Sequence, residues 1–441
     1  MATPVFKPEF THGTAQSPSG DAGDTDACFV DSFKRLHAVF KLSGGPENDL
    51  LTASEMLLRY VAGVLRDEMP SAPDATTAEW LRLMELLRSH WIQPLLYWKV
   101  GHLPPSTHPP EEVYHLLRNA FMTSRVTSLK AGCMLNDILH AFAAENIPVI
   151  VLKGPALAFS IYPDPAIRSF SDLDLLVTPE HFVAARGALI RKGFKPVFHR
   201  FELFTDLQYE EHFSPHPGSL HALTVELHWN PLRSYGIKRT DTLQGLFDRA
   251  LRIDTPAVSF NTLSHVDALI LYSQHMILHH TQDIRLSWLY DISLLAGCIS
   301  ADEAWEELKQ RCCELRGVVA VEYSLRLARC WTGLQLPDSV DNFSSWPKPC
   351  HEESTVITQV FAYNKTVRNM SLFNLSFYGL LLGQYLSREA SLSGKIRLLY
   401  RLIFPGTEYL KQTHPFSSRW MIPVSYISYW TSWCRKIFGT R

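Results

Sequence analysis

The 441-residue sequence lacks the features by which composition alone assigns a protein to a class. Its formal net charge is −2 and its pI is near 6.8, so it has no surplus of basic residues like that of a nucleic-acid binder. Its most apolar late stretch, residues 371–386, is interrupted by Asn374 and Gln384 and predicts a buried helix, not a membrane span. Internal repeats and low-complexity tracts are also absent.

Cysteine motifs are missing as well. The eight cysteines include no CxxC pair and no spacing typical of zinc ligands. Adjacent Cys312 and Cys313 lie in a helix-like stretch, where buried thiols are expected and not a disulfide. Acidic and small residues extend to about Asp26, without the basic-then-apolar pattern of a signal peptide. We therefore expect a disordered lead-in over residues 1–28 and a cytoplasmic, reducing location.

What the chain does contain is enough apolar material for two or three packed units. Hydrophobic residues make up 46% of it and charged residues 20%. Helical periodicity dominates before residue 146 and after residue 255, and two strand-like patterns lie between these positions. The predicted order is an N-terminal helical region (29–145), a mixed core (146–255), a helical region (256–365) and a basic, aromatic C-terminal helical region (366–441).

The central stretch joins two apolar strands through a short helix. The first strand is predicted at residues 149–152, and the second begins with Asp172 and Asp174 and continues Leu-Leu-Val. Residues two apart on a strand point to the same face, so the two carboxylates are predicted to lie side by side. Such a pair repels unless a cation lies between its members, and Mg²⁺ prefers oxygen ligands of this kind.

A third carboxylate is expected on a neighbouring strand. Residues 220–229 alternate apolar side chains with polar ones, which is typical of a half-buried strand. Glu226 and His228 share its polar face. Two aspartates and Glu226 could together hold two Mg²⁺ ions on a nucleotide's phosphates. Alternatively, Asp172 is a turn residue, Asp174 is an exposed strand residue and His228 has a structural hydrogen bond.

Phosphate contacts are predicted beside the carboxylates. Lys153 and Gly154 precede Pro155, a residue typical of a helix start, where free backbone N–H groups attract anions. Lys153 would contact phosphate, or would lie in water at the strand end. Arg168 would clamp a phosphate, or would form a salt bridge with Asp164 or Asp172.

Four blocks of the sequence together resemble a known family. They are Leu152-Lys-Gly154 with Tyr162-Pro-Asp-Pro165, Arg168 and Ser171-Asp-Leu-Asp-Leu-Leu-Val177; Val225-Glu-Leu-His-Trp229; the histidine-rich segment 275–291; and Arg401-Leu-Ile-Phe-Pro405. They are similar to the uncharacterised nucleotidyltransferase family of the DNA polymerase beta superfamily, over about residues 30–412.

The resemblance implies an α+β fold, with a small mixed sheet, flanking helices and added helical regions at both ends. It also implies Mg²⁺-dependent transfer of a nucleotidyl group from an NTP. The metal ligands would be Asp172, Asp174 and Glu226, with Lys153, Gly154, Arg168, Ser171 and His228 around the nucleotide. The chain departs from the superfamily in two places: Lys153-Gly154 replaces a glycine-serine or glycine-glycine loop, and Glu226 stands where aspartate is usual.

The acceptor is not predicted: a small molecule, a peptide and a saccharide all remain open. His275 and His279 would pack against the sheet, or would share a metal, and the role of Asp291 is open. The C-terminal tail could lie on anionic lipid or fold as a solvated helix. Two other functions remain as alternatives, namely a glycosyltransferase with a DxD metal site and a degenerate module that binds a nucleotide or a partner without turnover.

Overall fold

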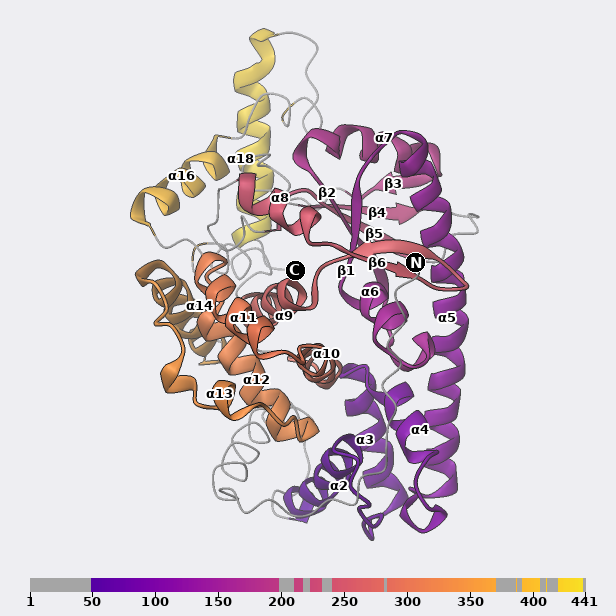
Figure 1. Cartoon of the computed structure of the whole chain (residues 1–441). Helices are drawn as coiled ribbons and strands as arrows, with labels where there is room; N and C mark the ends of the chain where they lie inside the picture. Colours follow the sequence, from indigo (N-terminus) through magenta and orange to yellow (C-terminus); the bar gives the residue numbers. More distant parts are fainter. Residues whose placement is uncertain are drawn as a thin grey trace.

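The computed structural model of the chain describes residues 49–197, 210–216, 223–231, 240–280, 284–369, 386, 391–404, 410 and 419–438. Figure 1 shows a sheet beside the long helix α5, together with helices that come before and after the sheet in the sequence. The predicted lead-in over residues 1–28 lies outside the described residues. So does the predicted buried helix over residues 371–386, except for its last residue.

Helices precede the sheet, as predicted. A capping box begins α3 at Thr76: its hydroxyl accepts from the Glu79 N–H, and the Glu79 carboxylate accepts from the Thr76 N–H. The Pro-rich turn ends this helical group, and Pro110 leads into α5. These elements are α2 (Asp49–Leu65), α3 (Thr77–Ser89), α4 (Gln93–Val100), η1 (Pro105–Thr107) and α5 (Glu111–Ala144).

The sheet has seven strands in the order β3-β4-β5-β2-β1-β7-β6. Pairs β2–β5 and β1–β7 are parallel and the other pairs are antiparallel, so the sheet is mixed. The strands are β1 (Val149–Leu152), β2 (Asp172–Val177), β3 (Phe194–Pro196), β4 (Glu210–Pro215), β5 (Thr224–His228), β6 (Leu251–Asp254) and β7 (Ser259–Thr262).

Short helices connect the strands. Proline starts two of the turns, and Gly193 ends the α7 connection with a φ of +89°, a conformation that glycine adopts without strain. These elements are α6 (Lys153–Ser160), η2 (Pro165–Ile167), η3 (Pro179–His181), α7 (Phe182–Arg191) and α8 (Thr240–Asp248).

Beyond the sheet the described chain is helical. The stretch from His265 to Gly297, within the predicted helical region, contains α9, a π-helical turn and α10. The elements are α9 (His265–Gln274), η5 (His275–His279), α10 (Leu286–Gly297), α11 (Asp302–Glu314), α12 (Val318–Thr332), α13 (Asp338–Asp341), η6 (Phe343–Ser345), α14 (His351–Asn369), α16 (Leu392–Ile403), η7 (Arg419–Met421) and α18 (Ile422–Phe438).

The two faces of the sheet belong to different cores. Leu173, Leu175 and Val177 on β2 pack in a cluster with the C-terminal half of α5, α6 and α7. Leu176, one residue out of phase, packs in a second cluster with α9, α10 and the N-terminal helices. Because side chains alternate along a strand, Asp174 lies on the same face as Leu176, toward α9. The strand period therefore places the polar residues of β2 opposite helix α9.

The predicted α+β fold with a mixed sheet and flanking helices is confirmed. The domain boundaries stay predictions. Cys312 and Cys313 both have free thiols, the first buried and the second exposed. The cytoplasmic, reducing location expected from the cysteine pattern stays a prediction. Each helix in the described part of the chain is too short or too polar to cross a bilayer.

Candidate active site

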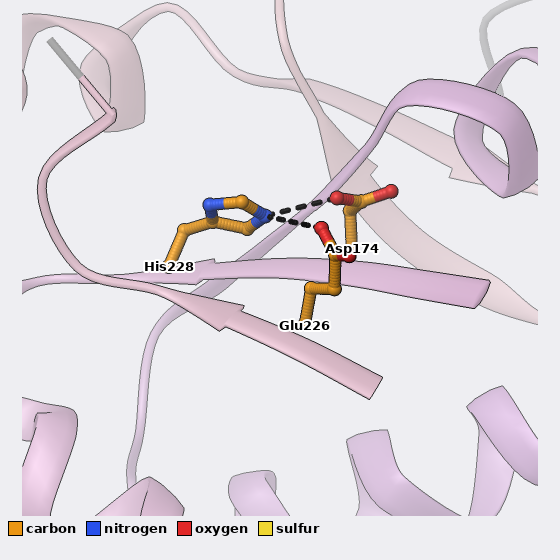
Figure 2. Close-up of side chains that lie close together, drawn as sticks. All are labelled: Asp174, Glu226 and His228. Atoms are coloured by element: carbon orange, nitrogen blue, oxygen red, sulfur yellow. Dashed lines mark hydrogen bonds and ion pairs between the residues drawn. The ribbon is translucent and has the colours of Figure 1, made fainter. Parts of the chain in front are cut away.

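Two of the three predicted acidic ligands meet on neighbouring strands. Strands β2 and β5 are parallel neighbours, and Asp174 lies directly opposite Glu226 in their register. Figure 2 shows both carboxylates turned toward His228 on the same face of the sheet. One ligand atom from each of these three residues lies within 4.8 Å of the other two. The predicted proximity of Glu226 to the Asp-bearing strand is confirmed.

Asp172 does not join this group. It begins β2 and lies opposite Thr224, whereas Asp174, two residues later, lies opposite Glu226. Burial, together with the charge of Asp174, raises the pKa of the Asp172 carboxyl. The observed group is thus Asp174, Glu226 and His228, with an imidazole where a second aspartate was expected.

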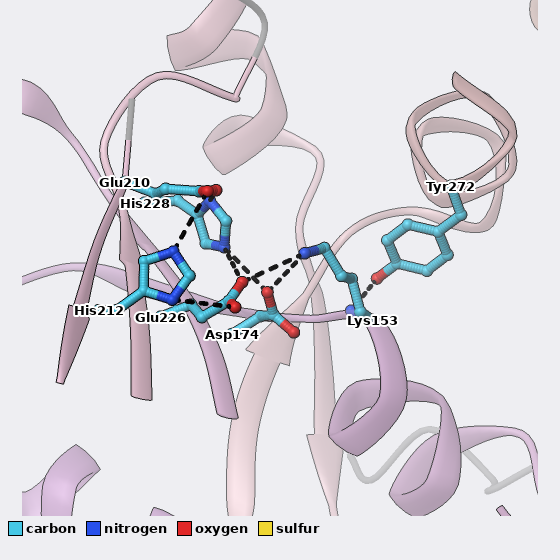
Figure 3. Close-up of polar contacts among 7 residues, drawn as sticks. All are labelled: Lys153, Asp174, Glu210, His212, Glu226, His228 and Tyr272. Carbon is cyan, nitrogen blue, oxygen red and sulfur yellow. Dashed lines mark hydrogen bonds and ion pairs between the residues drawn. The ribbon is translucent and has the colours of Figure 1, made fainter. Parts of the chain in front are cut away.

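Lys153 does not lie in water at the strand end but pairs with the carboxylates, and its predicted contact with phosphate stays a prediction. Its ammonium donates to Asp174 Oδ1 at 2.6 Å and lies 3.6 Å from Glu226 Oε2 (Figure 3). The residue is the first of α6 and has a φ of +53°, which is costly for a side chain with a Cβ. Its backbone N–H donates to the Tyr272 hydroxyl at 2.6 Å. A positive charge therefore lies between the two carboxylates, where a metal ion would bind.

The charges of this cluster are strongly coupled. Burial disfavours the charged form of Lys153, but Asp174 and Glu226 more than offset this and raise its pKa well above the usual value. Burial likewise opposes the ionisation of Asp174, yet the Lys153 ammonium and His228 hold its pKa far below the usual range. Burial and the charge of Asp174 raise the pKa of Glu226 to about 7. One carboxylate is thus permanently charged, and its neighbour takes up a proton near neutral pH.

Two residues that sequence reasoning missed complete the cluster. Glu210 and His212 lie on β4, antiparallel to β5, where Glu210 faces His228 and His212 faces Glu226. His228 Nδ1 is 3.1 Å from Glu210 Oε2, and His212 Nδ1 is 3.3 Å from Glu226 Oε1. A signal was present in the sequence, because Glu210-x-His212 and Glu226-x-His228 have the same spacing.

Hydrogen bonds settle the role of His228 in this structure. Its Nε2 lies 2.9 Å from Asp174 Oδ1 and 3.6 Å from Glu226 Oε2. Burial lowers the pKa of the imidazole, but the hydrogen bonds to Asp174 and Glu210 raise it to about 9. His228 is therefore a buried imidazolium that links the acidic residues of three strands.

Arg168 is a structural residue in this geometry. Its guanidinium donates to both carboxylate oxygens of Asp291 at 2.7–3.0 Å, and both side chains are about 95% buried. Tyr162 donates to the same carboxylate at 2.7 Å. The partner is neither Asp164 nor Asp172, as the sequence had suggested, because α10 brings Asp291 to the loop before β2. The salt bridge also answers the open question of Asp291.

Gly154 and Ser171 lie at the edge of the cluster. A Cβ on Gly154 would lie 2.8 Å from the Cβ of Phe170, so close packing alone requires glycine there. Ser171 is exposed in the bend directly before β2. The nucleotide contacts predicted for Gly154 and Ser171 stay predictions.

A pocket of about 190 Å³ opens beside the cluster. Lys153, Glu226 and His228 form one wall, and Tyr272 with the π-helical histidines forms another. The His275 and His279 rings are stacked with centroids 5.2 Å apart. They line the pocket and do not belong to a metal-capable group of the described residues. Trp288 packs against the core and against His280, with centroids 4.9 Å apart.

The residues fit a divalent cation by the chemistry of their donors. Asp174 and Glu226 offer carboxylate oxygens, and His228 offers a ring nitrogen once its proton is lost. Lys153 shows that the gap between the two carboxylates already holds a positive charge. The arrangement can therefore bind a cation next to a pocket that opens to substrate.

The family match covers three of the four blocks noted in the sequence, and the fourth, residues 401–405, lies outside it. The profile of a family described as uncharacterised nucleotidyltransferase matches residues 76–333, more than half of the chain. Among solved structures, an antigenic nucleotidyltransferase-like protein from Paracoccidioides brasiliensis is similar at 15% identity. That match covers 44% of this chain and 93% of that chain, with a TM-score of 0.29. No curated protein sequence matches the chain.

Proposed function

The chain belongs to the uncharacterised nucleotidyltransferase family, and on that premise we propose that it transfers a nucleoside monophosphate from an NTP to an acceptor hydroxyl with the help of Mg²⁺. One observation carries the proposal. Asp174 and Glu226 face each other on adjacent parallel strands and enclose a cation position at the edge of a pocket.

The metal would be held by Asp174 and Glu226, with His228 or Asp172 as further ligands. When bound, Mg²⁺ neutralises charge that develops on the transferring phosphoryl group. Lys153 would leave the carboxylates and bind the phosphates, because its side chain is 24% exposed and can move into the pocket. A flexible ammonium is a common point-charge ligand of phosphate.

The reaction itself makes one bond and breaks one. The acceptor oxygen forms a bond to the α-phosphorus, and the bond from that phosphorus to the β-phosphate bridging oxygen breaks to release pyrophosphate. The hydroxyl proton passes to a carboxylate at the cluster. As a ligand of the metal, Glu226 would help the ion to activate the acceptor hydroxyl.

A second candidate is a module that binds a nucleotide without turnover. The observation that favours it is the ion pair itself: Lys153 and His228 neutralise the acidic cluster without any metal. The N–H of Lys153, a donor expected for phosphate, is bonded to the Tyr272 hydroxyl. Membership of a nucleotidyltransferase family favours both candidates over a glycosyltransferase.

Labelled triphosphates distinguish these candidates. The purified chain is incubated with Mg²⁺, a cell extract and each of the four NTPs, labelled at the α- or the γ-phosphate. Transfer of α-label but not γ-label to an acceptor supports nucleotidyl transfer. Asp174→Asn is expected to abolish it, whereas Asp137→Asn, which alters an acid paired with Lys192 elsewhere, retains it.

Negative results also discriminate. Mg²⁺-dependent NTP binding without label transfer from any of the four nucleotides would favour the non-catalytic module. If neither binding nor transfer occurs, or if Asp174→Asn transfers as well as the unaltered chain, the proposed function is wrong. The acceptor class and a contact of the C-terminal tail with anionic lipid remain proposals that this experiment leaves aside.

A further inference from the structure

Two copies of the same short motif face each other across strands β4 and β5. Glu210-x-His212 and Glu226-x-His228 run antiparallel, so each glutamate lies directly opposite a histidine of the other strand. The spacing of two puts all four side chains on one face. Figure 3 shows the four side chains gathered beside Asp174. Such a square of alternating acids and imidazoles offers both nitrogen and oxygen ligands.

The two oxygens of Glu226 face different sides of this square. Glu226 Oε2 lies 3.6 Å from the Lys153 ammonium and 3.6 Å from His228 Nε2. Glu226 Oε1 lies 3.3 Å from His212 Nδ1. One carboxylate thus borders two separate positions, the gap shared with Asp174 and a second one shared with β4. A carboxylate that bridges two sites in this manner can contribute one oxygen to each.

The second position has the composition and access of a metal site. Glu210, His212 and Glu226 each offer a ligand atom, and these atoms lie within 4.8 Å of one another. Metal bonds of about 2.0–2.2 Å require ligand atoms that are closer still, so small side-chain movements would close the set. Their side chains are 28%, 28% and 18% exposed. An ion can enter from solvent without displacing Lys153, which pairs only with the other side.

The alternative to a metal site is that these four side chains bond only to one another and stabilise the sheet. His212 Nε2 lies 3.4 Å from Glu210 Oε1, longer than a normal N–H···O hydrogen bond. The contact of His212 with Glu226, at 3.3 Å, is also long. In contrast, the pairs of His228 and Lys153 with Asp174 are 2.9 and 2.6 Å long. The distances from His212 to the two glutamates can therefore shorten around an ion, while Glu210 also lies 3.1 Å from His228 Nδ1.

We propose that Glu210, His212 and Glu226 form a binding site for a divalent first-row transition metal, with Zn²⁺ preferred over Mg²⁺. The imidazole sets this preference, because nitrogen ligands suit Zn²⁺ whereas Mg²⁺ is held by oxygen. Three protein ligands leave coordination positions open to water or a substrate group, as in catalytic zinc sites. The site is distinct from the Asp174–Glu226 gap and does not depend on nucleotidyl transfer.

The test uses the full chain without a polyhistidine tag, titrated with ZnCl₂ or MgCl₂ and no nucleotide. Calorimetry and elemental analysis after dialysis are expected to show one tightly bound Zn²⁺, with Mg²⁺ weaker by on the order of 100-fold. Co²⁺ used as a probe is expected to give visible absorption bands of a nitrogen- and oxygen-bound ion. His212→Ala and Glu210→Gln are each expected to weaken Zn²⁺ binding by at least about tenfold.

Two further variants separate this site from the proposed active site. Asp174→Asn is expected to keep the Zn²⁺, and His115→Ala, which removes an exposed histidine paired with Glu111 on α5, is a matched control that also keeps it. Circular dichroism verifies folding, and Glu210→Gln preserves shape if His212→Ala unfolds. The proposal would be overturned if the unaltered chain binds no Zn²⁺, if His212→Ala and Glu210→Gln bind Zn²⁺ as tightly as the unaltered chain, or if Asp174→Asn loses the Zn²⁺. The label-transfer experiment is unaffected by any of these outcomes.

Discussion

If the proposed metal binds between Asp174 and Glu226, Lys153 would compete with it for this gap, and the removal of Lys153 gives the most informative prediction. In Lys153→Met the long side chain is kept but the ammonium is lost. The contact at 2.6 Å with Asp174, which is 3% exposed, no longer has to be broken when Mg²⁺ binds. We therefore expect Lys153→Met to bind Mg²⁺ more tightly than the unaltered chain does in the absence of nucleotide.

The size of the gain follows from the interaction that is removed. A hydrogen bond to a charged group contributes about 1.5–3 kcal/mol net. This corresponds to roughly 10- to 100-fold in the Mg²⁺ affinity. The value is an upper estimate, because the displaced ammonium regains hydration when it leaves the carboxylates. The effect of Lys153→Met on nucleotide affinity is expected to be the opposite. The Kd for an NTP is expected to rise, because Lys153 is the proposed phosphate ligand.

The assay is calorimetric titration with MgCl₂ at about pH 8.5. That pH lies above the pKa of Glu226 in the unaltered chain, which burial and the charge of Asp174 raise to about 7. Loss of the Lys153 ammonium, which lowers this pKa, shifts it upward in the variant. Lys192→Met is the matched control, since Lys192 forms a Lys–Asp pair at 2.5 Å that is 35% and 44% exposed. Mg²⁺ affinity in Lys153→Met that is no greater than in Lys192→Met would refute the competition.

Three further predictions concern stability. Asp291→Ala leaves the Arg168 guanidinium buried without its carboxylate and is expected to cost about 3–5 kcal/mol in urea unfolding; a loss below 1 kcal/mol would contradict a structural role. Hydrogen bonds to Asp174 and Glu210 outweigh burial and raise the pKa of His228 to about 9, above its ordinary 6.5. The stability it adds is fully present below pH 6.5 and is lost as the pH rises through 9, by about 3 kcal/mol, and His228→Gln is expected to remove this slope from the pH series of unfolding free energies. Gly154→Ala is expected to cost about 1–3 kcal/mol in the same assay because its Cβ would clash with Phe170, and an unchanged midpoint would show that the backbone can yield there.

Much of the fold could be read from local patterns. The capping box at Thr76, the long helix from Glu111 and both core strands follow from periodicity and helix-start residues, which act within a few positions. The proximity of Glu226 to Asp174 was also predicted. That prediction needed the order of strands as well as their pattern, and it relied on the resemblance to a family.

Contacts between charged residues that are far apart in the sequence could not be predicted from local patterns. Asp291 is 123 residues from Arg168, and no spacing rule joins them. Glu210 and His212 come from a strand whose neighbour is set by the sheet, so their repeated Glu-x-His pattern has meaning only once β4 lies against β5. Lys153 could have pointed to solvent, but burial next to two carboxylates makes the ion pair more favourable.

By itself, the sequence determined the strands, the helix starts and the face on which each acidic residue lies, because alternation and capping depend on neighbours along the chain. Only the tertiary structure decided which charges meet. It placed Lys153 between Asp174 and Glu226, gave Arg168 to Asp291 and brought a second Glu-x-His pair beside the first. The physical reason is that a charge buried in a protein must find a partner, and its partner is chosen by position in space.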